Sequence, residues 1–159
     1  MGGRYNEVQC QKVFKLSRSG VLDRIDALLG TVSNPSFSAV LRGEPISISG
    51  TPLVAFWMVR RSVSFLTLAD ESSETEFMIR GYFRMQAAAD VRESLELDIW
   101  NTAVNIDSAL RGDSDLAGNA QDIEIGDITT GYTDVGGVAY RTVDVPLTVQ
   151  IYSDVAITP

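Results

Sequence analysis

The chain has 159 residues, about the length of one domain, and its 45% apolar and 21% charged residues are typical of a folded protein. It contains no histidine and one cysteine, Cys10, which excludes Ser/His and Cys/His nucleophile pairs, an internal disulfide and a cysteine-rich zinc site. No apolar run reaches the roughly 18–20 residues of a membrane helix, and the net charge of −8 argues against affinity for nucleic-acid phosphates.

The charge is divided unevenly along the chain. Residues 1–61 contain eight Lys or Arg and four Asp or Glu, a net of +4, whereas residues 62–159 contain five and seventeen, a net of −12. Such a split is commonly an accident of the solvated surface, an interpretation we favour by about two to one. It would also suit a protein whose copies meet through unlike surfaces, because complementary potentials fix the register of association.

The first third of the chain favours a helix followed by a long connection. Hydrophobic spacing predicts one helix over residues 6–29, with Gly20 as a candidate break. Its clearest apolar stripe is Val21, Leu22, Ile25, Leu28 and Leu29. Residues 31–52 contain three prolines and two glycines and are expected to form a connection, in which Ile46–Ile48 is a candidate short strand.

Strands are predicted between residues 53 and 85. Leu53–Val59 is apolar without alternation, as in a strand covered on both faces, and Arg60-Arg61 is expected to end it. Val63–Leu68 is again β-prone and precedes a predicted polar turn at Asp70–Glu74. Thr75–Met85 alternates between apolar and polar residues. Its inward residues are Phe77, Ile79, Phe83 and Met85, with Gly81 among them leaving room for a bulky neighbour.

A long amphipathic helix is predicted over Asp90–Arg111. Asp90 and Glu93 have the spacing of a capping box, and Gly112 is a suitable end. The apolar stripe is Val91, Leu95, Ile99, Ala103, Ile106 and Leu110, widened by Leu97, Trp100 and Val104. A helix this apolar needs a sheet to cover.

The last part of the chain predicts a bulged hairpin. Ile123 and Ile125 alternate, and the phase then breaks across Gly126-Asp127, which is typical of a β-bulge. Asp134–Gly137 has the composition of a hairpin turn. The following strand alternates over Val143–Ile151, and Pro146 within it requires either an edge position or a bulge.

These elements predict one α+β domain over residues 1–159. Its sheet is mainly antiparallel and packs against the long amphipathic helix, with the N-terminal helix added. Trp57 and Trp100 are expected in the core, by about four to one.

No catalytic constellation emerges, and we expect no enzyme activity, cofactor or metal. The segment Asp113–Glu124 has Asp, Asp, Gly and Glu at four EF-hand positions, but Ala117 and Asn119 occupy the fifth and seventh positions and no helix is predicted after it. A solvated connection is therefore favoured, by about nine to one. No general base is predicted beside Cys10, so we expect an inert thiol.

The segment from Arg60 to Leu68 is the candidate subunit interface. The sheet already has enough inward residues, and an extended β-prone arm can dock on another subunit by strand addition. The candidate contact residues are Arg60, Arg61, Val63, Phe65, Leu66 and Leu68. If the segment instead continued a hairpin with Thr75–Met85, the two arms would form a projecting ribbon.

At Arg80-Gly81-Tyr82-Phe83-Arg84, followed by Asp90 and the long helix, the sequence resembles the tail terminator (tail completion) proteins of long-tailed bacteriophages and phage-like particles. The resemblance covers about residues 53–152, and the N-terminal helix fits by position. Four further segments resemble the closing hairpin of that family: Asp115–Gly118, Ile128–Asp134, Gly136–Tyr140 and Val145–Val149.

The resemblance implies a structural virion subunit, assembled in the host cytoplasm. Such subunits form a ring, expected to be a hexamer, on the head-proximal end of the tail tube. The ring ends polymerisation of the tail tube protein and docks to a head-completion or stopper protein. DNA would pass through its lumen without specific binding, and no membrane partner is implied.

Two alternatives remain open from the residues. One is another neck component, such as a head–tail stopper. The other is an α+β module that binds a small ligand between helix and sheet.

Overall fold

The computed structural model describes residues 20–65, 70–85 and 88–154, and in this part of the chain six strands form one mixed sheet. A helix over residues 20–30 precedes the first strand. The other elements are β1 (Ala39–Arg42), β2 (Leu53–Phe65), β3 (Asp70–Arg84), α2 (Ala89–Arg111), β4 (Asp122–Ile125), β5 (Thr129–Val135) and β6 (Val138–Asp154). The strand order is β1-β2-β3-β6-β4, with β5 also paired to β6, and only the β1–β2 pair is parallel. The predicted α+β class with a mainly antiparallel sheet is confirmed.

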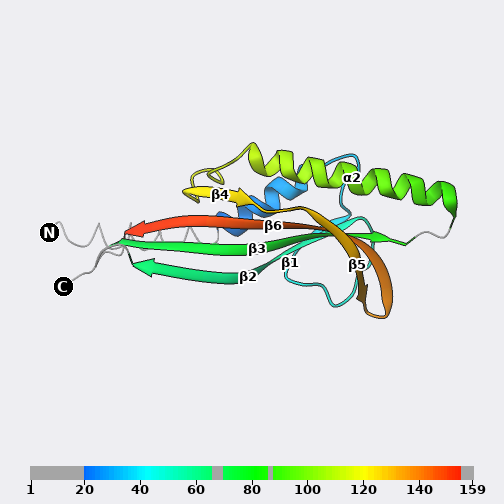
Figure 1. Cartoon of the computed structure of the whole chain (residues 1–159), viewed down its shortest axis with the longest axis horizontal. Helices are drawn as coiled ribbons and strands as arrows, with labels where there is room; N and C mark the ends of the chain where they lie inside the picture. The colour runs from blue at the N-terminus through cyan, green and yellow to red at the C-terminus, as the bar shows by residue number, and fades with distance from the viewer. Residues whose placement is uncertain (1–19, 66–69, 86–87, 155–159) are drawn as a thin grey trace.

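Both helices pack on the same face of the sheet (Figure 1). The helix at residues 20–30 contributes Val21, Ile25, Leu28 and Leu29 to the core, as its stripe predicts. The strands contribute alternate residues, including Phe77 and Ile79 of β3 and Val143, Val145, Leu147 and Val149 of β6. Alternation along β3 and β6 therefore predicted the covered face correctly, because successive strand residues point to opposite sides. The exception is Met85, which was predicted to point inward but follows the end of β3 and is 43% exposed.

Helix α2 lies where the sequence places it, although its first residue differs. Ile99, Ile106 and Leu110 are buried, and Gly112 ends the helix with its N–H on the Ser108 carbonyl. The predicted capping box is wrong: the residue before the helix is Ala88, with no side-chain cap, so Asp90 lies inside the helix. Gly81 of β3 faces this helix, and a Cβ there would lie 3.8 Å from Thr102 Cγ2. This is an ordinary van der Waals distance, so a methyl group would also fit between the strand and the helix at this position.

Pro146 lies in β6 between β3 and β4, so the edge position predicted as one option is wrong. The alternative, an irregularity, is confirmed. Residues 126–128 on one strand face 145–146 on the other, one residue more than regular pairing allows, and the strand divides there into β4 and β5. The Gly126 N–H donates to the Pro146 carbonyl over 2.9 Å. Beyond the break, Gly136 and Gly137 take φ of +60° and +81°, as a tight hairpin turn requires.

The second face of the sheet is also partly covered, at the end near β1. Tyr82 and Tyr140 are buried there with Leu53 and Ala55, and Ala39 and Leu41 of β1 pack against them. The short strand predicted at Ile46–Ile48 is wrong. Ile46 is 91% exposed, and the strand of this connection is instead β1, which pairs in parallel with Leu53–Phe56.

Candidate subunit interface

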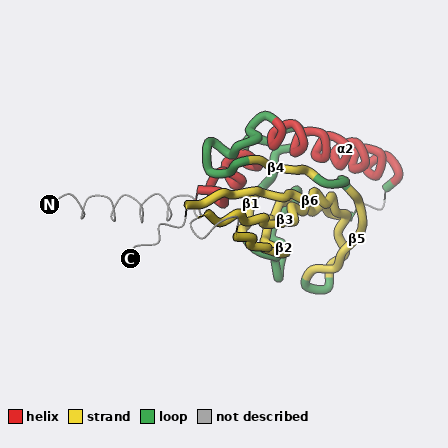
Figure 2. The backbone as a smooth tube through the Cα atoms, turned by 60° about the vertical axis from the view of Figure 1, so that its left-hand side comes forward, coloured by secondary structure: helices red, strands yellow, loops and turns green. Residues whose placement is uncertain are grey.

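Strands β2, β3 and β6 extend beyond the helices as a long three-stranded ribbon (Figure 1). Figure 2 shows the sheet in a turned view, with α2 lying along one side of it. The predicted strand end at Arg60-Arg61 is wrong, because β2 continues through both residues to Phe65. The predicted polar turn at Asp70–Glu74 is also wrong, since these residues form the first part of β3. A register shift between Met58 and Arg60 explains the misleading pattern: one extra residue, Val59, changes the phase of the strand.

Both arginines of the predicted interface are paired within the chain. Arg60 Nη2 lies 2.9 Å from Glu76 Oε1, and Arg61 Nη2 lies 3.3 Å from Glu71 Oε1, both acids being on β3. The side chains remain 63% and 38% exposed. Exposed pairs of this kind contribute about 1 kcal/mol or less to stability, and a guanidinium has five donors, so each arginine keeps capacity for a further partner.

The remaining predicted interface residues lie at or beyond the end of the described ribbon. Val63 is 41% exposed. The Phe65 backbone is paired with Glu71, whereas its side chain, Leu66 and Leu68 lie outside the described residues. Met58 and Val59 are further exposed apolar side chains on β2, at 58% and 57%.

The outward side of α2 carries three exposed large apolar side chains among exposed charged residues such as Glu93 and Arg111, an arrangement that was not predicted from the sequence. Trp100 is 70% exposed, so its predicted place in the core is wrong, and Leu97 and Val104 beside it are 59% and 46% exposed. The sheet covers only the arc of α2 that contains Ile99, Ile106 and Leu110. The width of the predicted apolar stripe could have indicated this exposure, because the stripe is wider than the arc of a helix that one sheet face can bury. We call Leu97, Trp100 and Val104 the α2 outer stripe.

Trp57 is partly buried against Tyr82 and its neighbours, in fair agreement with its predicted core position. The Arg80 guanidinium lies over its ring, with Cζ 5.6 Å from the ring centroid. Burial raises the pKa of the Tyr82 hydroxyl, which leaves the phenol neutral at ordinary pH.

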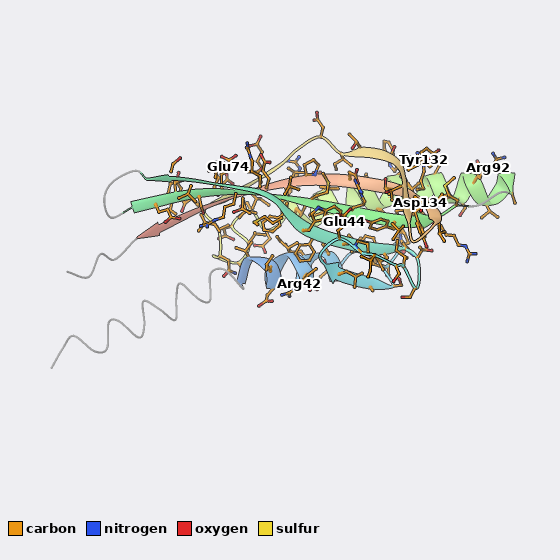
Figure 3. The ribbon with its side chains drawn as sticks, turned by 90° about the horizontal axis from the view of Figure 1, so that it is seen from below. Arg42, Glu44, Glu74, Arg92, Tyr132 and Asp134 are labelled. Atoms are coloured by element: carbon orange, nitrogen blue, oxygen red, sulfur yellow. The ribbon has the colours of Figure 1, made fainter. Side chains whose placement is uncertain are left out.

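The open face of the ribbon, away from the helices, is acidic. Adjacent rows of paired residues cross β3, β6 and β4: Glu74–Gln150–Asp122 and Glu76–Thr148–Glu124. Arg60 stands beside Glu76 at the end of the second row. Glu74 lies on the ribbon, far from Tyr132 and Asp134 on β5 and from Arg92 at the start of α2 (Figure 3). The second half of the chain thus concentrates part of its negative charge on one surface.

The EF-hand-like segment is used for a structural contact. The Arg24 guanidinium donates to an Asp113 oxygen, and the other Asp113 oxygen accepts the Ala117 N–H over 3.0 Å. The hydrogen bond from Arg24 lowers the pKa of the Asp113 carboxyl. Its last residues, Asp122 and Glu124, belong to β4. In the described ranges, no group of three or more His, Cys, Asp or Glu is placed to hold a metal ion. Cys10 lies outside those ranges.

A shallow hollow of about 150 Å³ lies between the first turns of α2 and the end of β3. Pro52, Phe83 and Leu95 form part of its wall. Ligand pockets usually enclose about 300–1,000 Å³, so this hollow gives little support to the ligand-binding alternative. Within the described part of the chain, no helix is long and apolar enough to cross a membrane.

The sequence matches no protein-family model and no curated protein.

Proposed function

We propose that this protein is a tail terminator subunit: a structural virion protein that forms a ring on the head-proximal end of a tail tube. The ring ends polymerisation of the tail tube protein and docks to a head-completion protein, and it needs no cofactor, metal or catalytic residue. A hexamer is the stoichiometry that the resemblance implies.

One observation carries the proposal: a single subunit exposes two unlike apolar surfaces. The α2 outer stripe lies on the helical side, and Met58, Val59 and Val63 lie on the ribbon. Clustered apolar side chains in water usually indicate a protein partner. Two different surfaces on one chain suit head-to-tail contacts, which close into a ring when the rotation between copies allows it.

The arrangement of the segments that resemble tail terminators supports the same proposal. Arg80–Arg84 lies in β3, directly before α2, and Ile128–Asp134 and Gly136–Tyr140 together form most of the β5–β6 hairpin. The acidic open face of the ribbon suits the wall of a DNA channel, because like charge repels phosphates and discourages sticking.

Size-exclusion chromatography with light scattering, followed by negative-stain microscopy, tests the proposal. We expect closed rings whose mass corresponds to a hexamer of the 17.3 kDa chain. A monomer over the accessible concentration range would overturn the ring. Adding the protein to polymerising tail tube protein of the same particle distinguishes the function from the stopper alternative, since only a terminator shortens the tubes.

The variant Trp100→Ser should abolish either the ring or the binding of the head-completion protein, without changing thermal unfolding. Ser108→Ala, at an exposed position on the same helix, is the matched control and should behave as the wild type.

A further inference from the structure

The sheet has two edges without a strand partner among the described residues. At one edge, β1 covers only Leu53–Phe56, which leaves the rest of β2 uncovered over Trp57–Phe65. At the other edge, β4 is the terminal strand and pairs with β6 alone. An uncovered edge carries unpaired N–H and C=O groups and is a template for a further strand.

The two edges have opposite charge. The uncovered stretch of β2 carries Arg60 and Arg61 and no acidic residue, whereas β4 carries Asp122 and Glu124 and no basic residue. All four charged side chains belong to exposed residues. Like edges would therefore repel each other, and the β2 edge of one copy is complementary to the β4 edge of another.

The strand directions also fit such a joint. β2 is antiparallel to β3, and β3 and β4 are both antiparallel to β6, so the two edge strands run in opposite directions. Suppose that two neighbouring copies are related by a rotation that leaves corresponding strands pointing the same way. β2 of one copy then runs antiparallel to β4 of the next. The helices then stay on the same face of every subunit, and the acidic rows stay on the other.

We propose that neighbouring copies of this chain join by strand addition, with the uncovered edge of β2 in one copy paired antiparallel to β4 of the next. The joint extends one sheet from subunit to subunit around the ring. Arg60 lies on the same face as Asp122 and Glu124 and acts there as their basic partner, whereas Arg61 points to the other face of the sheet. The inference rests on the proposed ring and adds a backbone joint to it, with the exposed Met58, Val59 and Val63 on the β2 side of that joint.

Engineered disulfides test the joint, because the two edges lie too far apart within one subunit. Ser62 shares a row with Glu74, Gln150 and Asp122. Three strand spacings span about 14 Å, whereas a disulfide needs Cα atoms within about 7 Å. All variants carry Cys10→Ser, so that only the engineered cysteines can react. Two registers place the whole of β4 against the uncovered part of β2 and keep Asp122 on the same face as Ser62 and Ser64. The pair Ser62→Cys with Asp122→Cys tests one register, and the pair Ser64→Cys with Asp122→Cys tests the other.

We expect one of these pairs to give a ladder of covalent oligomers after mild oxidation, ending at the ring size on a non-reducing gel. The matched control combines Ser62→Cys with Thr148→Cys. Thr148 lies on the same face but on the interior strand β6, two strand spacings from the joint, and this pair should stay monomeric.

The outcomes separate the joint from the function. Rings that form normally but give no ladder with either pair would overturn the edge-to-edge joint and leave the proposed function standing. A ladder from a protein that forms open filaments or dimers would overturn the ring and support the joint. A monomer without any ladder would overturn both.

Discussion

Arg80 and Asp144 face each other across β3 and β6 and form a two-point ion pair, with Nε–Oδ1 at 2.6 Å and Nη2–Oδ2 at 3.1 Å. Their side chains are 22% and 19% exposed. The hydrogen bonds that Arg80 donates to the Asp144 carboxylate raise the pKa of Arg80, and the same guanidinium lies over the Trp57 ring. One cation therefore connects three strands at the place where the ribbon joins the covered part of the sheet.

Replacing Asp144 with Asn should destabilise the protein by about 1–3 kcal/mol, since it leaves a largely buried guanidinium without its counter-ion. Urea unfolding monitored by circular dichroism measures the change. Asp134→Asn, at an exposed position in β5, is the control and should shift stability by no more than about 0.5 kcal/mol. Equal stability of the two variants would contradict a structural role for the pair.

Thr102→Val should stabilise the protein by about 1 kcal/mol, because a buried unpaired hydroxyl costs more than the methyl that replaces it. Thr102 is fully buried on α2, and Oγ1 has no hydrogen-bond partner among the described residues. Valine has nearly the same shape and the same branching at Cβ. The urea midpoint measures the gain, and a loss of stability would mean that the hydroxyl bonds an ordered water.

The elements that the sequence predicted well are those whose burial is periodic. Strands β3 and β6 each bury one regular set of residues, so the period identifies both their type and their covered face, whereas for α2 it identifies the helix but not the full extent of the buried arc. Strand β1 was not predicted, because four residues are too few to show a periodic pattern. Its pairing with β2 is parallel and depends on tertiary packing. The bulge at Val59 had the same effect on β2, since a change of phase resembles the end of a strand.

The candidate interface was predicted in part. The sequence indicated the β-prone stretch around Arg60 and Val63, which is exposed on the ribbon. It did not indicate the α2 outer stripe, because hydrophobicity says how much surface could be buried and not which arc a sheet will cover. Trp100 was assigned to the core for that reason. The acidic rows could not be predicted either, because they depend on how β6 pairs with β3 on one side and with β4 on the other. Only that pairing places Glu74 and Asp122 in one row.

Ile99→Asp should prevent folding, whereas Leu97→Asp, two residues away on the same helix, should leave the monomer folded. Ile99 is 3% exposed and packs on the sheet, and burying a carboxylate without a partner costs several kcal/mol against a typical stability of about 5–15 kcal/mol. Leu97 is 59% exposed. Circular dichroism and soluble yield distinguish the two, and a folded Ile99→Asp variant would contradict the assignment of the buried face.

Asp113→Asn should lower stability at pH 7 by up to about 1 kcal/mol, a modest value because Arg24 is 38% exposed. Arg24 lowers the pKa of the folded carboxyl below the unfolded value of about 3.9. The pair therefore contributes fully above that value, and its contribution is lost as the pH falls through the folded pKa. Urea unfolding at several pH values should show the difference between variant and wild type narrowing below about pH 4. A difference independent of pH would mean that the charge of Asp113 is unimportant.

The protein should not retain duplex DNA at physiological salt, even if it surrounds DNA in a particle. Binding to phosphates depends on release of counterions by Lys and Arg, and the open face of the ribbon presents Glu74, Asp122 and Glu124 instead. The double variant Glu74→Lys with Glu124→Lys reverses charge at two exposed positions in adjacent rows. It should bind a labelled duplex measurably at low salt, with an affinity that falls steeply as salt is added. Fluorescence anisotropy across a salt titration measures both proteins. Micromolar retention by the wild type at physiological salt would contradict the prediction, because the acidic face could not then act as a non-adhesive wall.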